Sequence, residues 1–122
     1  MLNKLLITGA NGQLGAVCRK RLPPLAKTLR LNARKGLGEA KSNEELVYCD
    51  LSDKVAVEAL VEGCDGIVHM GGQATEAPWE TIQAANIDGM VNLFEAARKS
   101  SVNPRIVFAL SLIHISEPTR LA

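Results

Sequence analysis

Short apolar runs alternate along this chain with longer segments in which apolar residues recur at helical spacing. The runs predict about five strands, and the longer segments predict the helices between them. The predicted strands are Lys4 to Thr8, Thr28 to Asn32, Leu46 to Cys49, Gly66 to Met70 and Arg105 to Ala109. Because the links are short, the strands are expected to be parallel and joined by right-handed crossovers. The pattern therefore indicates an α/β fold with one parallel sheet.

Two helices are predicted between the later strands. Ser52 would cap a helix over Lys54 to Glu62, which Gly63 would end. A long helix is expected from about Pro78 to Lys99, because proline suits a first turn and apolar or small residues recur on one side. That side carries Ile82, Asn86, Gly89, Leu93 and Ala97.

The link after the first strand carries three glycines spaced three apart, Gly9, Gly12 and Gly15. The pyrophosphate of a dinucleotide binds backbone N–H groups at a helix start, where side chains would keep it away. Gly9 permits the tight turn, Gly12 lets the backbone approach the phosphates, and Gly15 lets the helix pack on the sheet. A P-loop is excluded because no Gly-Lys-Ser/Thr ending follows. A glycine turn without a ligand is the alternative interpretation.

The segment after these glycines has the helical pattern that a dinucleotide motif requires. Its apolar face is expected to hold Leu14, Val17, Cys18 and Leu22, and Pro23 with Pro24 would end it. We therefore predict a nicotinamide dinucleotide site. The residues of the loop predicted to contact the cofactor are Gly9, Asn11, Gly12, Gln13, Leu14 and Gly15.

Composition and charge narrow the class of protein. Of 122 residues, 47% are hydrophobic and 22% charged, which suits one globular core. No apolar run is long enough for a membrane span or a secretory signal, so a cytoplasmic protein is predicted. The net charge of +1 gives no reason to expect nucleic acid or an anionic membrane as a partner. Cys18, Cys49 and Cys64 lack metal-ligand spacing and are interpreted as buried thiols.

Several stretches resemble the extended short-chain dehydrogenase/reductases, the NAD-dependent epimerase/dehydratase family. They are Thr8 to Gly15, Cys49 to Leu51, Gly63 to Gly72, Asn86 to Gly89 and Arg105 to Ala109. Within the family the chain is most similar to the uronate dehydrogenase branch. The resemblance implies a Rossmann fold cut short after the fifth strand, a sugar or sugar acid as substrate, and a homodimer as one option. It also implies that the cofactor contacts Asp50, Leu51, Met70, Gly71, Gly72 and Asn86.

For Asp50, a turn cap that closes the third strand is the alternative to an adenine contact. His69 lies inside an apolar strand, so a local hydrogen bond is predicted for its ring rather than a role as catalytic base. Gln73 and Thr75 follow in the next loop and are weak candidates for substrate contacts. Trp79 is expected to pack rather than to cover the site.

The residues after the second strand bear on the choice between NAD and NADP. NAD-binding domains usually carry an acid about 20 positions past the glycine loop, which accepts hydrogen bonds from the ribose hydroxyls. This chain has Ala33 where similar uronate dehydrogenases carry Asp. Arg34 and Lys35 follow and suit a 2′-phosphate, so the cofactor is NAD or NADP, with a slight preference for NADP and with Arg34 as a contact. Solvated loop charges are the alternative interpretation of this basic pair.

The family's catalytic pair is missing from the chain. In the family, a tyrosine whose pKa is lowered by a lysine four residues later deprotonates the substrate hydroxyl. The single tyrosine, Tyr48, has Ser52 at that spacing. No catalytic or metal-binding residue is therefore assigned, and this polypeptide is not expected to turn over a substrate.

The segment from Leu110 to Arg120 resembles the translation of a sequencing adapter. A native tail in which Ser111 to Ile115 extends the fifth strand is the alternative interpretation. We expect residues 1–109 to be the N-terminal part of an NAD(P)-binding Rossmann domain and residues 110–122 to be a non-native tail. For the parent protein, the prediction is an oxidoreductase that transfers hydride from a sugar or sugar acid to the nicotinamide. A nucleotide-sugar epimerase or dehydratase and a non-catalytic NAD(P)-sensing module are the alternatives.

Overall fold

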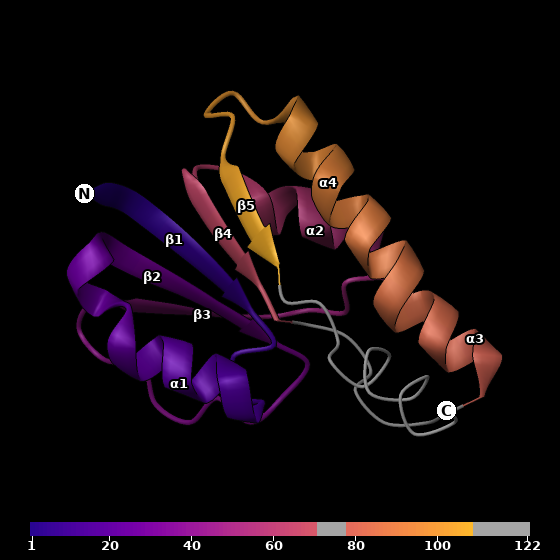
Figure 1. Cartoon of the computed structure of the whole chain (residues 1–122), viewed down its shortest axis with the longest axis horizontal. Helices are drawn as coiled ribbons and strands as arrows, with labels where there is room; N and C mark the ends of the chain where they lie inside the picture. Colours follow the sequence, from indigo (N-terminus) through magenta and orange to yellow (C-terminus); the bar gives the residue numbers. More distant parts are fainter. Residues whose placement is uncertain (71–77, 109–122) are drawn as a thin grey trace, which may run out of the picture.

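A parallel sheet lies between two layers of helices in the computed structural model, which describes residues 1–70 and 78–108 (Figure 1). The strand order is β3-β2-β1-β4-β5, and each neighbouring pair is parallel. The strands are β1 (Leu2–Thr8), β2 (Ala26–Ala33), β3 (Glu44–Tyr48), β4 (Gly66–His69) and β5 (Arg105–Phe108). The predicted five-stranded Rossmann-like α/β fold is confirmed.

Helix α1 covers one face of the sheet, and α2 and α4 cover the other (Figure 1). The helical segments are α1 (Gln13–Arg21), the 3-10 turn η1 (Pro23–Leu25), α2 (Lys54–Val61), α3 (Trp79–Ile82), the π-helical η2 (Gln83–Asp88) and α4 (Gly89–Lys99). The long helix predicted from Pro78 is therefore present but passes through a π-helical stretch. No helix among the described residues is long and apolar enough to span a bilayer.

The central strand β1 shows why the sheet needs helices on both faces. Successive side chains of a strand point to opposite sides, so a strand buried on both faces is apolar without alternation. Leu5 and Ile7 enter the core beneath α1, whereas Leu6 enters the core beneath α2 and α4. All three side chains are buried, which fixes β1 at the centre of the unit.

Two details of the helices differ from the sequence predictions. Asp53, not Ser52, is the N-cap of α2, because its carboxylate accepts the N–H of Ala56 at 3.2 Å. Gly63 follows the end of α2 at φ +83°, as expected of a helix stop. In α1, Leu14 and Val17 are exposed, not core residues, because the helix turns Gly15 toward the loop below it.

Candidate dinucleotide site

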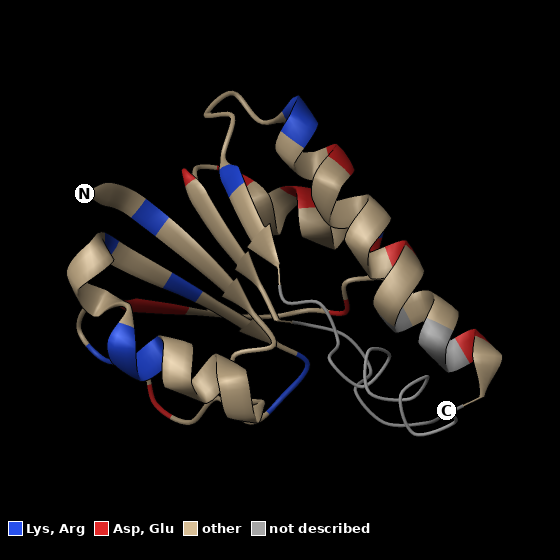
Figure 2. Ribbon diagram, in the orientation of Figure 1, with Lys and Arg blue, Asp and Glu red and all other residues tan. Residues whose placement is uncertain are grey.

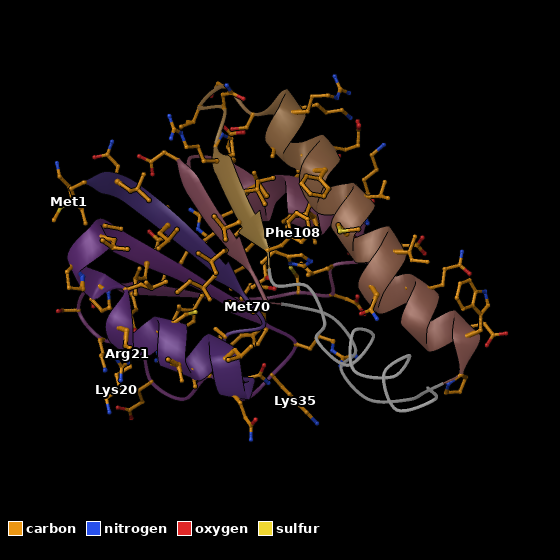
Figure 3. The ribbon with its side chains drawn as sticks, viewed as in Figure 1. Met1, Lys20, Arg21, Lys35, Met70 and Phe108 are labelled. Carbon is orange, nitrogen blue, oxygen red and sulfur yellow. The ribbon has the colours of Figure 1, made fainter. Side chains whose placement is uncertain are left out.

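The carboxyl ends of the strands meet the start of α1 at one edge of the sheet. Strand β1 lies between β2 and β4, so the chain order reverses beside it. In open α/β sheets, ligands bind at such a switch point, outside the carboxyl ends of the strands. Met70 and Lys35 mark this edge in Figure 3, and Met1 lies at the opposite end of β1. The predicted site therefore has the location that the fold favours.

The three glycines of the loop have different structural roles. Gly9 adopts φ +62°, which side-chain-bearing residues rarely do. A Cβ on Gly15 would lie 2.0 Å from the carbonyl oxygen of Gly9 and 2.8 Å from Cα of Ala10, so the fold itself excludes a side chain there. A Cβ on Gly12 would lie 3.4 Å from the carbonyl oxygen of Gly9, an ordinary contact. Among the described residues the fold thus has room for a methyl group at Gly12, and the approach of a pyrophosphate to this glycine stays a prediction.

The start of α1 is suited to an anion. Gly12 is its N-cap, and no side chain among the described residues caps it. Its first turn has no acidic residue, whereas Arg19, Lys20 and Arg21 stand in its last turn. The N-terminus of a helix is the positive end of its dipole, and here it lies at the glycine loop. No carboxylate in the first turn opposes a phosphate there. Gln13 and Leu14 are both exposed here, so the residues present fit a pyrophosphate.

Asn11 joins the glycine loop to the loop after β2. Its side-chain amide donates to the carbonyl oxygen of Lys35 at 2.9 Å. Gly36 follows at φ +78°, close to the Asn11 amide. Arg34, which begins this loop, is exposed. Figure 2 shows basic residues, in blue, in the loop that follows β2. Asn11 therefore brings the two predicted halves of the cofactor site together, and its contact with the cofactor stays a prediction.

Asp50 follows β3 and closes a turn, which is the alternative considered for it. Its Oδ1 accepts the N–H of Ser52 at 2.9 Å and the hydroxyl of Ser52 at 2.8 Å. These bonds, with a smaller attraction from Arg34, lower the pKa of the Asp50 carboxyl. Asp50 is therefore ionised at neutral pH and exposed at the same edge of the sheet, and the adenine contact remains a prediction.

Leu51 is held from the other side by the last helix. Its side chain is buried in the core, and its carbonyl oxygen accepts the side-chain amide of Asn92 at 2.9 Å. A Cβ on Gly89 would lie 3.1 Å from Cβ of Leu51, so α4 approaches this residue closely. The half-buried Asn86 lies just before α4 in η2, and π-helical turns are frequent at functional sites. Sequence reasoning missed Asn92, since only the fold places it beside Leu51.

Thr8 and His69 connect the ends of β1 and β4. The two residues are opposite each other in the parallel register of β1 and β4. Thr8 Oγ1 lies 2.7 Å from His69 Nδ1. Thr8 Oγ1 also accepts the N–H of Met70 at 2.9 Å. The hydrogen bond predicted for the His69 ring is confirmed, but its partner lies 61 positions away in the chain and is not local. Thr8 was missed, although a polar residue ending a buried strand signals a buried partner.

The pKa of His69 gives a testable pH dependence. Burial lowers it, so folding favours the neutral ring. The stability that this provides is present above the unfolded pKa of about 6.5 and is lost as the pH falls below it. We expect the urea midpoint to fall between pH 7 and pH 5 by more in the parent chain than in His69→Gln, whose side chain does not titrate. Equal pH dependence of the two midpoints would contradict this account.

The remaining predicted residues divide into three groups. Gly71, Gly72, Gln73 and Thr75 lie outside the described residues.

The three cysteines are free thiols. Cys64 is buried and Cys18 and Cys49 are half-buried, and burial raises the pKa of Cys49 and Cys64. Trp79 is 61% exposed, so the packing expected for it is not found within the described part of the chain. Across residues 1–70 and 78–108, no cluster of metal-ligating side chains occurs.

Comparison with known proteins assigns this arrangement to a family. The model of the NAD dependent epimerase/dehydratase family matches residues 5–117. Uronate dehydrogenase of Agrobacterium fabrum is 56% identical over 110 residues, which are 90% of this chain and 41% of that protein. Uronate dehydrogenase of Pseudomonas putida is 49% identical over 110 residues, 89% of this chain and 41% of that protein. The chain thus spans about two fifths of the length of these relatives.

Solved structures agree with the sequence matches. A mutant of uronate dehydrogenase from Agrobacterium tumefaciens, complexed with NAD, superposes with a TM-score of 0.84 at 56% identity, over 88% of this chain and 40% of that one. Glucuronic acid dehydrogenase from Chromohalobacter salexigens superposes with a TM-score of 0.86 at 52% identity, over 89% of this chain and 41% of that one. The fold is therefore shared with uronate and glucuronic acid dehydrogenases, one of which was solved with NAD.

Proposed function

This chain belongs to the NAD-dependent epimerase/dehydratase family, and from that premise we propose that it is the nucleotide-binding portion of an NAD-dependent uronate dehydrogenase-like oxidoreductase. Gly12 carries the proposal. The fold leaves space for a methyl group there, so the absence of a side chain serves the approach of a pyrophosphate to the start of α1. The domain would be residues 1–109, and residues 110–122 would not belong to it.

The proposed contacts of this chain have separate tasks. The loop residues Gly9 to Gly15 would hold the pyrophosphate with backbone N–H groups, and Thr8 with His69 fixes β1 against β4 beside it. Asp50 and Leu51 would bind the adenine, and Arg34 the adenosine ribose. Met70, Gly71, Gly72 and Asn86 complete the proposed set. When bound, NAD supplies the hydride acceptor.

We propose NAD rather than NADP as the cofactor. The preference for NADP predicted from Arg34 and Lys35 finds no support in the relatives, one of which was solved with NAD. Within this chain, Arg34 lies near enough to the ionised Asp50 to lower its pKa. The charge of Arg34 is thus partly offset, and a 2′-phosphate would gain less from it than the sequence suggests.

Turnover is a separate matter from binding. The Tyr-Lys pair is absent from these 122 residues, so we propose that this polypeptide binds nucleotide without oxidising a substrate. The identity of the relatives favours a uronate as the substrate class of a longer protein that carries this sequence. An epimerase or dehydratase of the same family would instead regenerate its cofactor within each cycle, with no net release of NADH.

Calorimetric titration with NAD and with NADP tests the binding proposal. We expect NAD to bind about 3- to 10-fold more tightly than NADP. The 2′-phosphate of NADP would be repelled by the carboxylate of Asp50, and the charge of Arg34 would compensate this repulsion only in part. With glucuronate and NAD present, we expect no reduced nicotinamide to form. As a positive control, a chimera with residues 1–108 in place of the matching segment of the Agrobacterium dehydrogenase is expected to produce NADH. A chain that binds neither nucleotide, or a chimera without activity despite folding, would refute the proposal.

A further inference from the structure

Arg19, near the end of α1, holds the loop that joins β2 to β3. Its Nε and Nη2 donate to the two carboxylate oxygens of Glu44 at 3.0 and 2.8 Å. Its Nη1 donates to the carbonyl oxygen of Leu37 at 2.7 Å, and Nη2 also reaches that of Glu39 at 2.9 Å. One guanidinium therefore binds a strand carboxylate and two loop carbonyls at once, which the planar fork of arginine allows.

The ion pair between Arg19 and Glu44 is shielded from solvent. The Glu44 side chain is 1% exposed and the Arg19 side chain 19%. Their mutual hydrogen bonds raise the pKa of Arg19 and lower that of Glu44, so both are charged at neutral pH. Removing one partner of such a pair leaves a buried charge without compensation, which makes the pair hard to break. The loop is therefore anchored to α1 by a fixed contact.

The same loop is held at two further points. Asn11 binds the carbonyl oxygen of Lys35, and the N–H of Leu37 donates to the hydroxyl of Tyr48 at 3.2 Å. The Leu37 side chain is buried in the core beneath α1. Residues 34–36 thus lie between fixed contacts on both sides. They follow β2, where a Rossmann fold recognises the adenosine ribose.

We propose that Arg19 is a positioning residue for the adenosine end of the cofactor. It acts through residues 34–39 and not by touching the nucleotide. A loop that is already ordered loses little conformational freedom on binding, whereas ordering a mobile loop at the same moment would weaken the affinity. This inference rests on the proposed function, because it assigns Arg19 a task at the same dinucleotide site.

Arg30 provides a matched control within the chain. It donates to Glu45 Oε1 at 2.9 Å and to the carbonyl oxygens of Leu60 and Glu62 at 2.7 and 2.9 Å. Its chemistry is thus that of Arg19, a carboxylate and two carbonyls, but it joins β2 to the end of α2. Adjacent residues of β3 point to opposite faces of the sheet. Glu44 therefore binds Arg19 on the face covered by α1, and Glu45 binds Arg30 on the face covered by α2. A purely structural role predicts equal effects on binding for both arginines.

The test compares Arg19→Lys with Arg30→Lys in the full chain. A lysine keeps the charge but does not span three acceptors. We expect Arg19→Lys to lower the melting temperature more than Arg30→Lys, because the Glu44 side chain is 1% exposed whereas that of Glu45 is 42% exposed and also pairs with Lys4 at 3.1 Å. Binding is therefore compared at a temperature at which both variants are folded. Only Arg19→Lys should weaken binding of NAD and of ADP, by about 3- to 10-fold and by the same factor for both, because they share the adenosine end. The N–H of Lys41 donates to Glu44 Oε1 at 2.9 Å, as that of Leu37 does to Tyr48. Without nucleotide, amide exchange at Leu37 and Lys41 should accelerate in Arg19→Lys alone.

The outcomes separate this inference from the proposed function. If the parent chain binds neither NAD nor ADP, both are overturned. If the parent chain binds both nucleotides but Arg19→Lys and Arg30→Lys bind them with equal affinity, only the role of Arg19 is overturned. The same holds if Arg19→Lys weakens the binding of NAD but not that of ADP. Should Arg19→Lys fail to fold, Glu44→Gln replaces it, because that change weakens the anchor while keeping a hydrogen-bonding side chain. Parent-like binding and exchange in Glu44→Gln would then overturn the role.

Discussion

Replacing Gly15 by alanine is expected to lower the free energy of unfolding by about 2 kcal/mol net, because overpacking a close contact costs about 3 kcal/mol. The added Cβ would lie 2.0 Å from the carbonyl oxygen of Gly9 and 2.8 Å from Cα of Ala10. Both are backbone atoms, so α1 or the loop must move. The better helix propensity of alanine recovers only about 1 kcal/mol. Urea denaturation followed by circular dichroism measures the loss.

Ala16→Gly is the control for Gly15→Ala. Ala16 is the next residue of α1 and is exposed, so its replacement changes helix propensity without a packing contact. We expect a loss of about 1 kcal/mol. If Gly15→Ala is as stable as the parent chain, the close approach of α1 to the glycine loop is wrong.

Replacing Gly12 by alanine is expected to separate binding from stability. The new methyl group would lie 3.4 Å from the carbonyl oxygen of Gly9, an ordinary contact, so the free energy of unfolding should change by less than about 1 kcal/mol, mostly from the poorer N-cap. The same group stands where the pyrophosphate would approach. We expect NAD to bind about 10- to 100-fold more weakly, as measured by calorimetric titration.

Lys20→Ala provides the comparison for Gly12→Ala. Lys20 is exposed near the opposite end of α1, and Figure 3 shows it far from Met70 and the carboxyl edge of the sheet. Its loss should leave both stability and NAD affinity near the parent values. Parent-like NAD affinity in Gly12→Ala would mean that the start of α1 does not bind the pyrophosphate, and the proposed site would have to be abandoned.

The two glycines illustrate how far the motif alone leads. Three glycines spaced three apart after an apolar strand predict a dinucleotide loop, and the sequence assigns a different role to each. The structure supports the packing role of Gly15, whereas the role of Gly12 toward a pyrophosphate stays a prediction. Both roles were predicted because the turn, the helix start and the strand are local features of a short stretch of sequence.

The sequence alone determined the order of strands and helices along the chain, the parallel sheet, the glycine loop and the need of His69 for a hydrogen-bond partner, but not which residue that partner is. These depend on periodicity, on turn residues and on the need of a buried polar group for a partner. Only the tertiary structure decided which face of each helix is buried and which side chains hydrogen-bond to one another. It exposed Leu14 and Val17 and placed Asn92 against Leu51.

The anchor of Arg19 on Glu44 and the bond of Thr8 to His69 join residues 25 and 61 positions apart in the chain. No local pattern specifies such pairs. They arise when parallel strands come into register and when a helix packs on one face of the sheet, because only then do the two side chains meet.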